Sequence, residues 1–454
     1  NRKARKGYLD MAFELPVEFE NRMRAMLGGE YEAFRAEYEK PHRRGVRLNT
    51  LKCDAETLAR TLPFPLAPTP FSPLSYYAPE AVRMASVPLY HAGAFYSQEP
   101  SASSAVTLLD PQPGEKVLDL CAAPGGKSTQ IAALTGDRGL LWSNEVVRSR
   151  ASALASNLER MGVKNAVVSS VYPEVLAEKL EGYFDRVLVD APCSGEGMFR
   201  RDPQAIAEWS PAHVEACAAR QLAILGSAAR CVCEGGVLVY STCTFSEEEN
   251  EGVVHAFLRE NPGFVLEKPD VAFGRPAYGV DAVRIFPMDG GEGHFAARFR
   301  RTAPNGYAAR PYDEKPDRQT EAAAQTFCAS VFTDWKAERF ARVRDRILLL
   351  PAVLPALSGL GVLRAGVELG EMKKNRIEPA HGIFMAAKPA QCRSVLHLRH
   401  DDPRLTAFLR GEEIPAEGLA GYTAVAVEGV VTGFGKASGG VLKNKYPKGL
   451  RIHG

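Results

Sequence analysis

Two cysteines follow directly on two apolar runs that are typical of buried strands, and this arrangement limits the folds open to the chain. The first run, residues 184–189, leads into an Asp-Ala-Pro-Cys-Ser-Gly motif that contains Cys193. The second run, residues 236–240, leads into a Ser-Thr-Cys-Thr-Phe motif that contains Cys243. Side chains at the carboxyl ends of parallel strands face one ligand crevice, and neighbouring strands lie about 5 Å apart. If these strands are neighbours, both thiols reach one pocket and predict covalent chemistry assisted by a second sulfur.

Strand and helix patterns alternate between residues 101 and 302, which predicts a doubly wound α/β sheet. Besides the two strands before the cysteine motifs, strands are expected at residues 116–120, 140–144 and 166–169. Helices are expected at residues 127–134 and 147–161 and after Ser210, which is followed by proline as a helix start often is.

The chain has 454 residues, more than one hydrophobic core usually holds, so several domains are expected. Residues 1–100 are predicted to form a helical N-terminal section, and residues 101–302 the α/β domain. Residues 303–349 are expected to form a linker and a helix. Residues 350–454 are expected to form a small C-terminal unit with a hairpin built from residues 422–427 and 430–432.

The cysteine content, rather than the charge, favours a protein of the reducing cytoplasm. The net charge is only +2, which neither requires nor excludes a nucleic-acid partner. The nine cysteines show no spacing typical of a metal site, so free thiols and no bound metal are expected. No long apolar run predicts a membrane span.

Basic residues gather at both ends of the chain. Arg2, Lys3, Arg5 and Lys6 open it, and no acidic residue occurs from Lys436 onward. The basic residues of that last stretch are Lys436, Lys443, Lys445, Lys448 and Arg451. They predict contacts with RNA phosphates, and the alternative is a tail that only solvent surrounds.

A glycine-rich turn follows the strand at residues 116–120 and leads into a helix. Gly125 and Gly126 let a ligand approach the backbone, but the turn has neither P-loop nor GxGxxG spacing. Glu145 ends the next strand, 19 residues after Gly126, where an acid suits the hydroxyls of a ribose. With Asp190, these features favour a nucleoside cofactor that needs no phosphate cradle, and S-adenosylmethionine fits. A structural turn beside a surface glutamate is the alternative.

Several motifs in combination resemble the Sun-type RNA cytosine-5 methyltransferases. They are Cys-Ala-Ala-Pro-Gly-Gly-Lys at residues 121–127, the two cysteine motifs at 190–195 and 241–244, and Glu-Glu-Asn at 248–250. Residues 47–50 and 93–99 resemble the segment that precedes them, and residues 363–366, 373–376 and 442–451 are similar to the RsmF-like group. The resemblance implies a Rossmann-like class I methyltransferase domain, S-adenosylmethionine, a C-terminal PUA-like RNA-binding domain and an N-terminal section that also contacts RNA. The implied partner is 16S rRNA or the small ribosomal subunit.

The same resemblance implies a role for each site residue. Cys243 would add to carbon 6 of cytosine and so activate carbon 5, and Cys193 would assist release of the product. Asp190 would hydrogen-bond the base, and Lys127 would belong to the active site. The residues expected to hold the cofactor are Cys121, Ala122, Ala123, Pro124, Gly125, Gly126, Lys127, Glu145, Ser170 and Asp190. Many relatives place Asp or Asn after the third strand, where this chain has Ser170.

The acidic run at Glu247, Glu248 and Glu249 has a structural interpretation. Ser246 and Glu249 match a capping box, and acids favour the first turn of a helix. We therefore expect the run to begin a helix.

Two alternative functions follow from the same residues. A DNA cytosine-5 methyltransferase would attack with Cys193, but the second motif at Cys243 and the lack of a recognisable DNA-recognition insertion argue against it. A ribosome-assembly factor could bind RNA without catalysis, although intact Cys193, Asp190 and Cys243 speak against decay. A monomer is expected.

Overall fold

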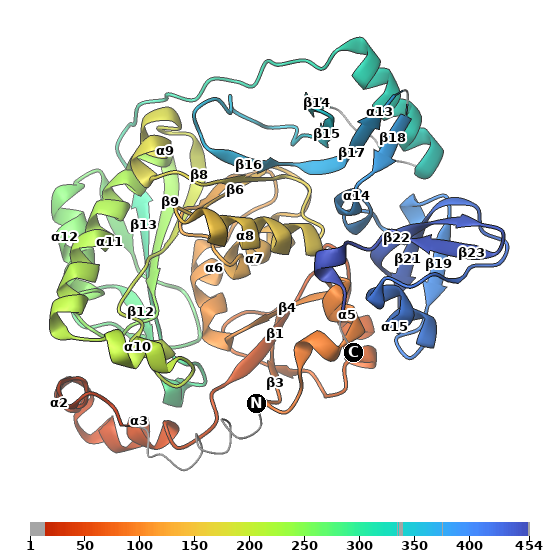
Figure 1. The fold of residues 1–454 in the computed structure, drawn as a ribbon. Coiled ribbons are helices and arrows are strands. Elements are labelled where there is room, and N and C mark those ends of the chain that lie inside the picture. Colours follow the sequence, from red (N-terminus) through yellow and green to blue (C-terminus); the bar gives the residue numbers. More distant parts are fainter. Residues whose placement is uncertain (1–13, 334, 336–338, 375, 453–454) are drawn as a thin grey trace.

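The computed structural model describes residues 14–452, apart from residues 334, 336–338 and 375. Its centre is a ten-stranded sheet (Figure 1). The strand order is β11 (Arg275–Pro276), β12 (Ala282–Ile285), β13 (His294–Arg301), β9 (Val232–Thr242), β8 (Phe184–Asp190), β5 (Lys116–Asp119), β6 (Leu140–Asn144), β7 (Ala166–Ser169) and β16 (Val362–Ala365), with β10 (Phe264–Glu267) paired to β13. The five strands from β9 to β7 run parallel, and this confirms the predicted doubly wound sheet.

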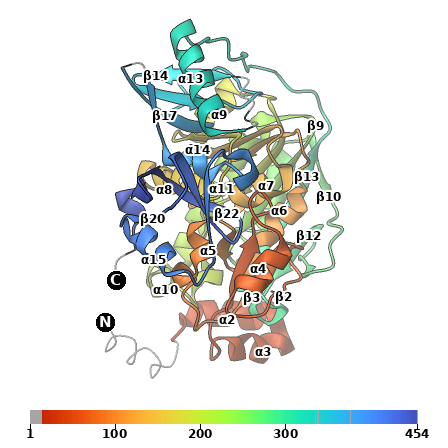
Figure 2. The same ribbon diagram turned by 90° about the vertical axis from the view of Figure 1, so that its right-hand side faces the viewer.

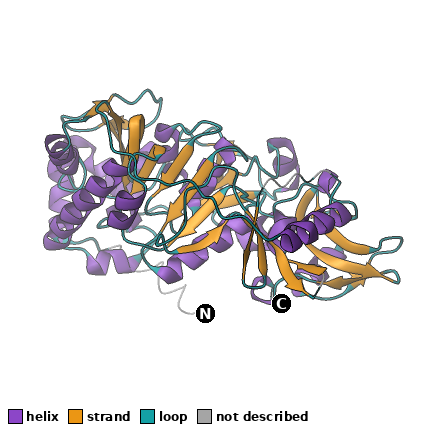
Figure 3. Ribbon diagram, turned by 90° about the horizontal axis from the view of Figure 1, so that it is seen from above, coloured by secondary structure: helices purple, strands orange, loops and turns teal. Residues whose placement is uncertain are grey.

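Helices cover both faces of this sheet (Figure 3). One face packs against α6 (Ser104–Leu109), α7 (Gly126–Thr135) and α8 (Arg148–Arg160). The other packs against α9 (Pro173–Lys179), α11 (Pro211–Cys231) and α12 (Glu251–Glu260). The Ser210 side chain accepts a hydrogen bond from the backbone N–H of His213, so the expected cap of α11 is present.

The N-terminal section is not helical throughout, and that prediction was wrong. Two helices open it, α2 (Val17–Leu27) and α3 (Tyr31–Glu37). A four-stranded sheet then forms in the order β2 (Ala67–Pro68), β3 (Ser75–Ala78), β1 (Arg44–Leu48) and β4 (Phe95–Gln98), with α4 (Ala55–Thr61) and α5 (Pro88–His91) between its strands. These strands are two to five residues long, and β1 pairs with β3 and β4 across wide sequence gaps. Local periodicity therefore gives little sign of them.

Two buried side chains of the N-terminal section connect it to the helices that cover the central sheet. Arg47 donates hydrogen bonds to Gln98 and, at 2.6 Å, to Thr129 Oγ1 on α7. Its burial lowers the pKa of the guanidinium to about 9. The Asn49 amide donates to the carbonyls of Gly93 and Met161, both at 2.8 Å. The motif at residues 47–50 thus fixes the orientation of the section.

The C-terminal part contains two further sheets (Figure 2). The first joins β14 (Phe340–Val343), β15 (Arg346–Leu349), β17 (Val367–Lys373) and β18 (Arg376–Pro379), beside α13 (Arg318–Val331) and α14 (His381–Met385). The second joins β19 (Val395–Leu398), β21 (Gly421–Val427), β22 (Val430–Ser438), β23 (Val441–Asn444) and β20 (Ile414–Pro415), beside α15 (Pro403–Arg410). The expected hairpin is β21 and β22.

The predicted boundary between residues 349 and 350 cuts the first of these sheets and is wrong there, because β15 pairs with β17. Strand β16, which follows this boundary in the sequence, pairs with β7 and forms an edge of the central sheet. The basic residues Arg2, Lys3, Arg5 and Lys6 lie outside the described residues. Within the described ranges, no helix combines the length and the apolar character needed to cross a membrane.

Candidate active site

The two cysteine motifs meet at the carboxyl edge of the central sheet. Strands β8 and β9 are parallel neighbours, and Asp190 pairs with Ser241 at their ends. The sulfur atoms of Cys193 and Cys243 are 3.3 Å apart, and the Cys243 backbone N–H lies 3.4 Å from the Cys193 sulfur. The structure therefore brings both thiols to one place, as the strand-end placement indicated.

The contact between the two thiols affects the protonation of Cys193. The hydrogen bond to Cys243 raises the pKa of Cys193 well above its ordinary value, and burial and the Cys243 charge raise it further. The Cys193 thiol therefore keeps its proton near neutral pH.

An ion pair lies at the end of β8. Lys127 Nζ donates to Asp190 Oδ2 at 2.6 Å, and the Ser241 hydroxyl donates to Asp190 Oδ1 at 2.8 Å. Burial opposes both charges, but the Lys127 ammonium outweighs it and lowers the pKa of Asp190. The Asp190 carboxylate in turn raises the pKa of Lys127 against the effect of burial. Both groups stay charged, in a fixed orientation beside the thiols.

A buried carboxylate, Glu196, ties the two motifs together. It accepts hydrogen bonds from the Thr244 hydroxyl at 2.7 Å and from the backbone N–H groups of Phe245 and Ser246 at 2.7 and 2.9 Å. The Trp209 indole N–H also donates to it, at 2.9 Å. Glu196 thereby fixes the backbone that follows Cys243. Sequence reasoning missed this residue, and its only signal was its position directly after the first motif.

The acidic run does not begin a helix, so the capping-box prediction was wrong. Helix α12 starts at Glu251, and the N-cap residue Asn250 makes no side-chain cap. Glu249 is instead fully buried and accepts from the Ser194 N–H at 2.9 Å, the Ser194 hydroxyl and the Gln221 amide at 2.7 Å. The burial raises the pKa of Glu249. These hydrogen bonds hold Ser194, the residue after Cys193, in place. A run of acidic residues in the sequence does not indicate such a buried contact.

The glycine-rich turn is fastened from three sides. The Ala122 N–H donates to the Asn144 carbonyl at 2.8 Å, which joins the ends of β5 and β6. Arg150 and Asn157 on α8 donate to the carbonyls of Ala123 and Pro124, at 3.1 and 2.9 Å. The turn therefore keeps its shape, with Gly126 starting α7 at its end.

The polar groups beside this turn suit the ribose of S-adenosylmethionine. Glu145 is buried at the end of β6, where Oε1 accepts from the Val147 N–H at 3.0 Å and Oε2 pairs with Arg150 at 3.2 Å. A carboxylate offers about four lone pairs, so both oxygens keep capacity for ribose hydroxyls. The Ser170 hydroxyl donates to the Val146 carbonyl at 3.1 Å, on the same rim of the sheet.

Family models match the chain along most of its length. The model described as 16S rRNA methyltransferase RsmB/F matches residues 106–300. Three models for parts of RsmF match the N-terminal domain at residues 15–100, the first C-terminal domain at 326–386 and the PUA domain at 395–452. The expected PUA-like domain is thereby confirmed.

Curated relatives and solved structures agree with these matches. Ribosomal RNA small subunit methyltransferase F of Klebsiella pneumoniae is 34% identical over 466 residues, covering 96% of each chain. Its namesake in Vibrio vulnificus is 32% identical and covers 96% of this chain and 97% of its own. A methyltransferase homologue from Pyrococcus horikoshii is 29% identical, with a TM-score of 0.57, over 64% of this chain and 96% of that one. NSun6 from the same organism, at 23% identity and a TM-score of 0.56, covers 63% and 98% and supports the fold alone.

Proposed function

Because the chain belongs to the 16S rRNA methyltransferase RsmB/F family, we propose that it methylates carbon 5 of a cytosine in 16S rRNA through a covalent bond between Cys243 and the base. It is an S-adenosylmethionine-dependent RNA methyltransferase. The 3.3 Å contact between Cys193 and Cys243 carries the proposal, since two thiols at one point suit a step that forms a bond to the base and a step that breaks it. The target base must leave its stack to reach them.

Cys243 acts first in this scheme. Its thiolate adds to carbon 6 of the cytosine, and the electrons displaced from the ring make carbon 5 nucleophilic. Bound S-adenosylmethionine supplies the methyl group that carbon 5 takes. The Asp190 carboxylate, held by Lys127 and Ser241, hydrogen-bonds the ring nitrogen 3 and amino edge and stabilises the protonated form of that edge.

Cys193 acts second. Once its sulfur is bonded to carbon 6, Cys243 no longer makes the thiol hydrogen bond and carries no thiolate charge, two of the factors that raise the pKa of Cys193. Cys193 can then give its proton to solvent water, and its thiolate accepts the proton on carbon 5. The electrons of that C–H bond restore the ring double bond, and the Cys243 thiolate leaves.

Purified protein tests this proposal directly. Incubated with S-adenosylmethionine and 16S rRNA or small ribosomal subunits, it should form 5-methylcytidine, detected after hydrolysis to nucleosides. Methylation of duplex DNA in place of RNA would favour the alternative function, that of a DNA cytosine-5 methyltransferase. RNA binding without methyl transfer to either substrate would favour the assembly factor. Action as a monomer in the cytoplasm is part of the same proposal.

Removing the Glu145 carboxylate should weaken binding of the cofactor. Glu145→Ala deletes an acceptor for the ribose hydroxyls, and a hydrogen bond to a charged group contributes about 1.5–3 kcal/mol, or about 10- to 150-fold in affinity. Calorimetry with S-adenosylmethionine measures the change. The exposed Glu178 on α9 provides a control, because Glu178→Ala should bind like the parent. Unchanged affinity in Glu145→Ala would exclude the ribose contact.

The basic tail is proposed to contact RNA phosphates. Lys436 and Lys443 lie directly opposite each other on β22 and β23, both exposed, and two like charges so placed repel unless an anion lies between them. Lys448 is also exposed. Lys445 differs, since it pairs with Glu378 at 2.8 Å, so the charge of the tail is partly neutralised by another strand.

A triple variant of the exposed lysines should therefore bind RNA less tightly. Replacing Lys436, Lys443 and Lys448 with alanine should lower the salt dependence of binding by about 0.7 log units for each lost single-strand phosphate contact. Titrations of RNA at several salt concentrations measure the slope. Lys445→Ala is the matched control with a smaller expected change. Parental affinity and slope in the triple variant would show that solvent alone surrounds these lysines.

A further inference from the structure

A buried histidine that the mechanism does not use lies at the same edge of the sheet as the thiols. Strand β13 begins at His294, and Phe295 pairs with Thr242, so His294 lies opposite the position of Cys243. Its exposed fraction is 7%. The charged groups that act on its ring are Glu99, Lys127, Asp190 and Arg201. His294 therefore shares the surroundings of the catalytic ion pair.

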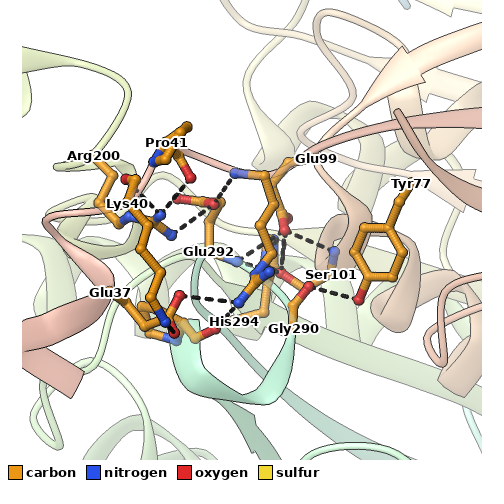
Figure 4. A network of polar contacts seen from close by, with 12 residues as sticks. Glu37, Lys40, Pro41, Tyr77, Glu99, Ser101, Arg200, Gly290, Glu292 and His294 are labelled. Atoms are coloured by element: carbon orange, nitrogen blue, oxygen red, sulfur yellow. Dashed lines mark hydrogen bonds and ion pairs between the residues drawn. The ribbon is translucent and has the colours of Figure 1, made fainter. Parts of the chain in front are cut away.

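One nitrogen of His294 is held by a chain of buried polar groups (Figure 4). The Glu99 carboxylate accepts from the backbone N–H groups of Ser101, Ala102 and Glu292, at 2.8, 2.8 and 2.9 Å. It also accepts from the Ser101 hydroxyl at 2.7 Å. The Ser101 oxygen lies 2.8 Å from His294 Nδ1. Since the hydroxyl has one proton and gives it to Glu99, the Ser101 oxygen accepts a hydrogen bond from Nδ1–H.

This arrangement determines the state of the other nitrogen. Burial, opposed by the Glu99 charge, lowers the pKa of His294 and keeps the ring neutral. With its proton on Nδ1, a neutral ring has a lone pair on Nε2. Nε2 has no hydrogen-bond partner within the part of the chain that the structure describes. This lone pair is therefore available to a donor from a bound nucleotide.

We propose that His294 Nε2 accepts a hydrogen bond from the exocyclic amino group of the target cytosine and so distinguishes cytosine from uracil. Uracil presents a carbonyl oxygen at the same position, which would face the lone pair and leave both acceptors unsatisfied. Asp190 accepts one hydrogen bond at each oxygen, from Lys127 or Ser241, and keeps lone pairs for ring nitrogen 3 and the amino proton beside it. His294 would accept a hydrogen bond from the other proton of the amino group. The assignment rests on cytosine methylation as proposed above. Ser101 is a positioning residue that fixes the tautomer.

A comparison of two target bases tests the contact. RNA substrates carry either cytosine or 2-pyrimidinone, which lacks the amino group, at the target position, and kcat/KM for methyl transfer is measured on each. The quantity compared is kcat/KM on cytosine divided by kcat/KM on 2-pyrimidinone. In His294→Phe, which keeps a ring but removes both nitrogens, this ratio should fall about 10-fold from the wild-type value. Ser101→Ala should give an intermediate fall. His255→Phe, on the exposed face of α12, should keep the wild-type ratio.

The outcomes distinguish failure of the His294 contact from failure of the proposed cytosine methylation. A wild-type ratio in both His294→Phe and Ser101→Ala, with thermal melting showing folded protein, would overturn the role of His294. If His294→Phe does not fold, the ratio in Ser101→Ala decides, because that variant retains the ring. A wild-type enzyme that methylates no cytosine would instead contradict the proposed function.

Discussion

Replacing Cys243 with alanine is expected to abolish methyl transfer and every covalent adduct with RNA. Without the thiolate no bond to carbon 6 forms, and carbon 5 stays unreactive. Loss of a nucleophile typically reduces kcat by about 10⁴-fold or more. Transfer of labelled methyl groups to 16S rRNA measures the rate, and denaturing gel electrophoresis detects the adduct. The cofactor should bind as in the parent, because the turn at residues 121–126 follows β5, and β8 separates β5 from β9, which Cys243 follows.

A matched cysteine outside the pocket provides the control. Cys233 lies near the start of β9 and is partly buried, and Cys233→Ala should retain activity. An adduct that persists in Cys243→Ala would show that another residue is the nucleophile.

Replacing Cys193 with alanine should have the opposite effect on the adduct. Addition and methyl transfer need only Cys243, whereas removal of the proton from carbon 5 needs the sulfur that lies 3.3 Å away. The protein should therefore accumulate covalently bound to methylated RNA, with turnover reduced to a single event per molecule. A gel that resolves protein from protein–RNA adduct measures this fraction.

The double variant separates the roles of the two thiols. Cys193→Ala combined with Cys243→Ala should form no adduct, since the trapped species depends on the Cys243 sulfur. Absence of an adduct in Cys193→Ala together with its presence in Cys243→Ala would reverse the assignment and make Cys193 the nucleophile.

The central sheet could be predicted because each of its parallel strands shows its own signal. Buried on both faces, these strands form continuous apolar runs, and the predicted ranges 140–144 and 166–169 match β6 and β7. The sharp turns after β5, β8 and β9 carry the chemistry, so motif and strand end coincide. The two thiols could therefore be placed together before the structure was known.

The parts that could not be predicted depend on contacts between distant segments. The sheet of the N-terminal section consists of short strands, and β16 joins the central sheet from nearly 200 residues beyond its partner β7. Glu196 and Glu249 resemble ordinary surface acids in the sequence, yet each is buried by donors that tertiary structure supplies. His294 has no distinguishing neighbours, and only the pairing of β13 with β9 places it at the site.

Bisulfite sequencing of 16S rRNA tests the central claim most directly, since 5-methylcytosine resists conversion. Cells that lack this protein would be compared with the same cells carrying either the wild-type chain or Cys243→Ala. The account predicts at least one cytosine that is protected only in cells with the wild-type chain and converted in both others. The same protected cytosines in the deletion strain, or protection restored by Cys243→Ala, would contradict it.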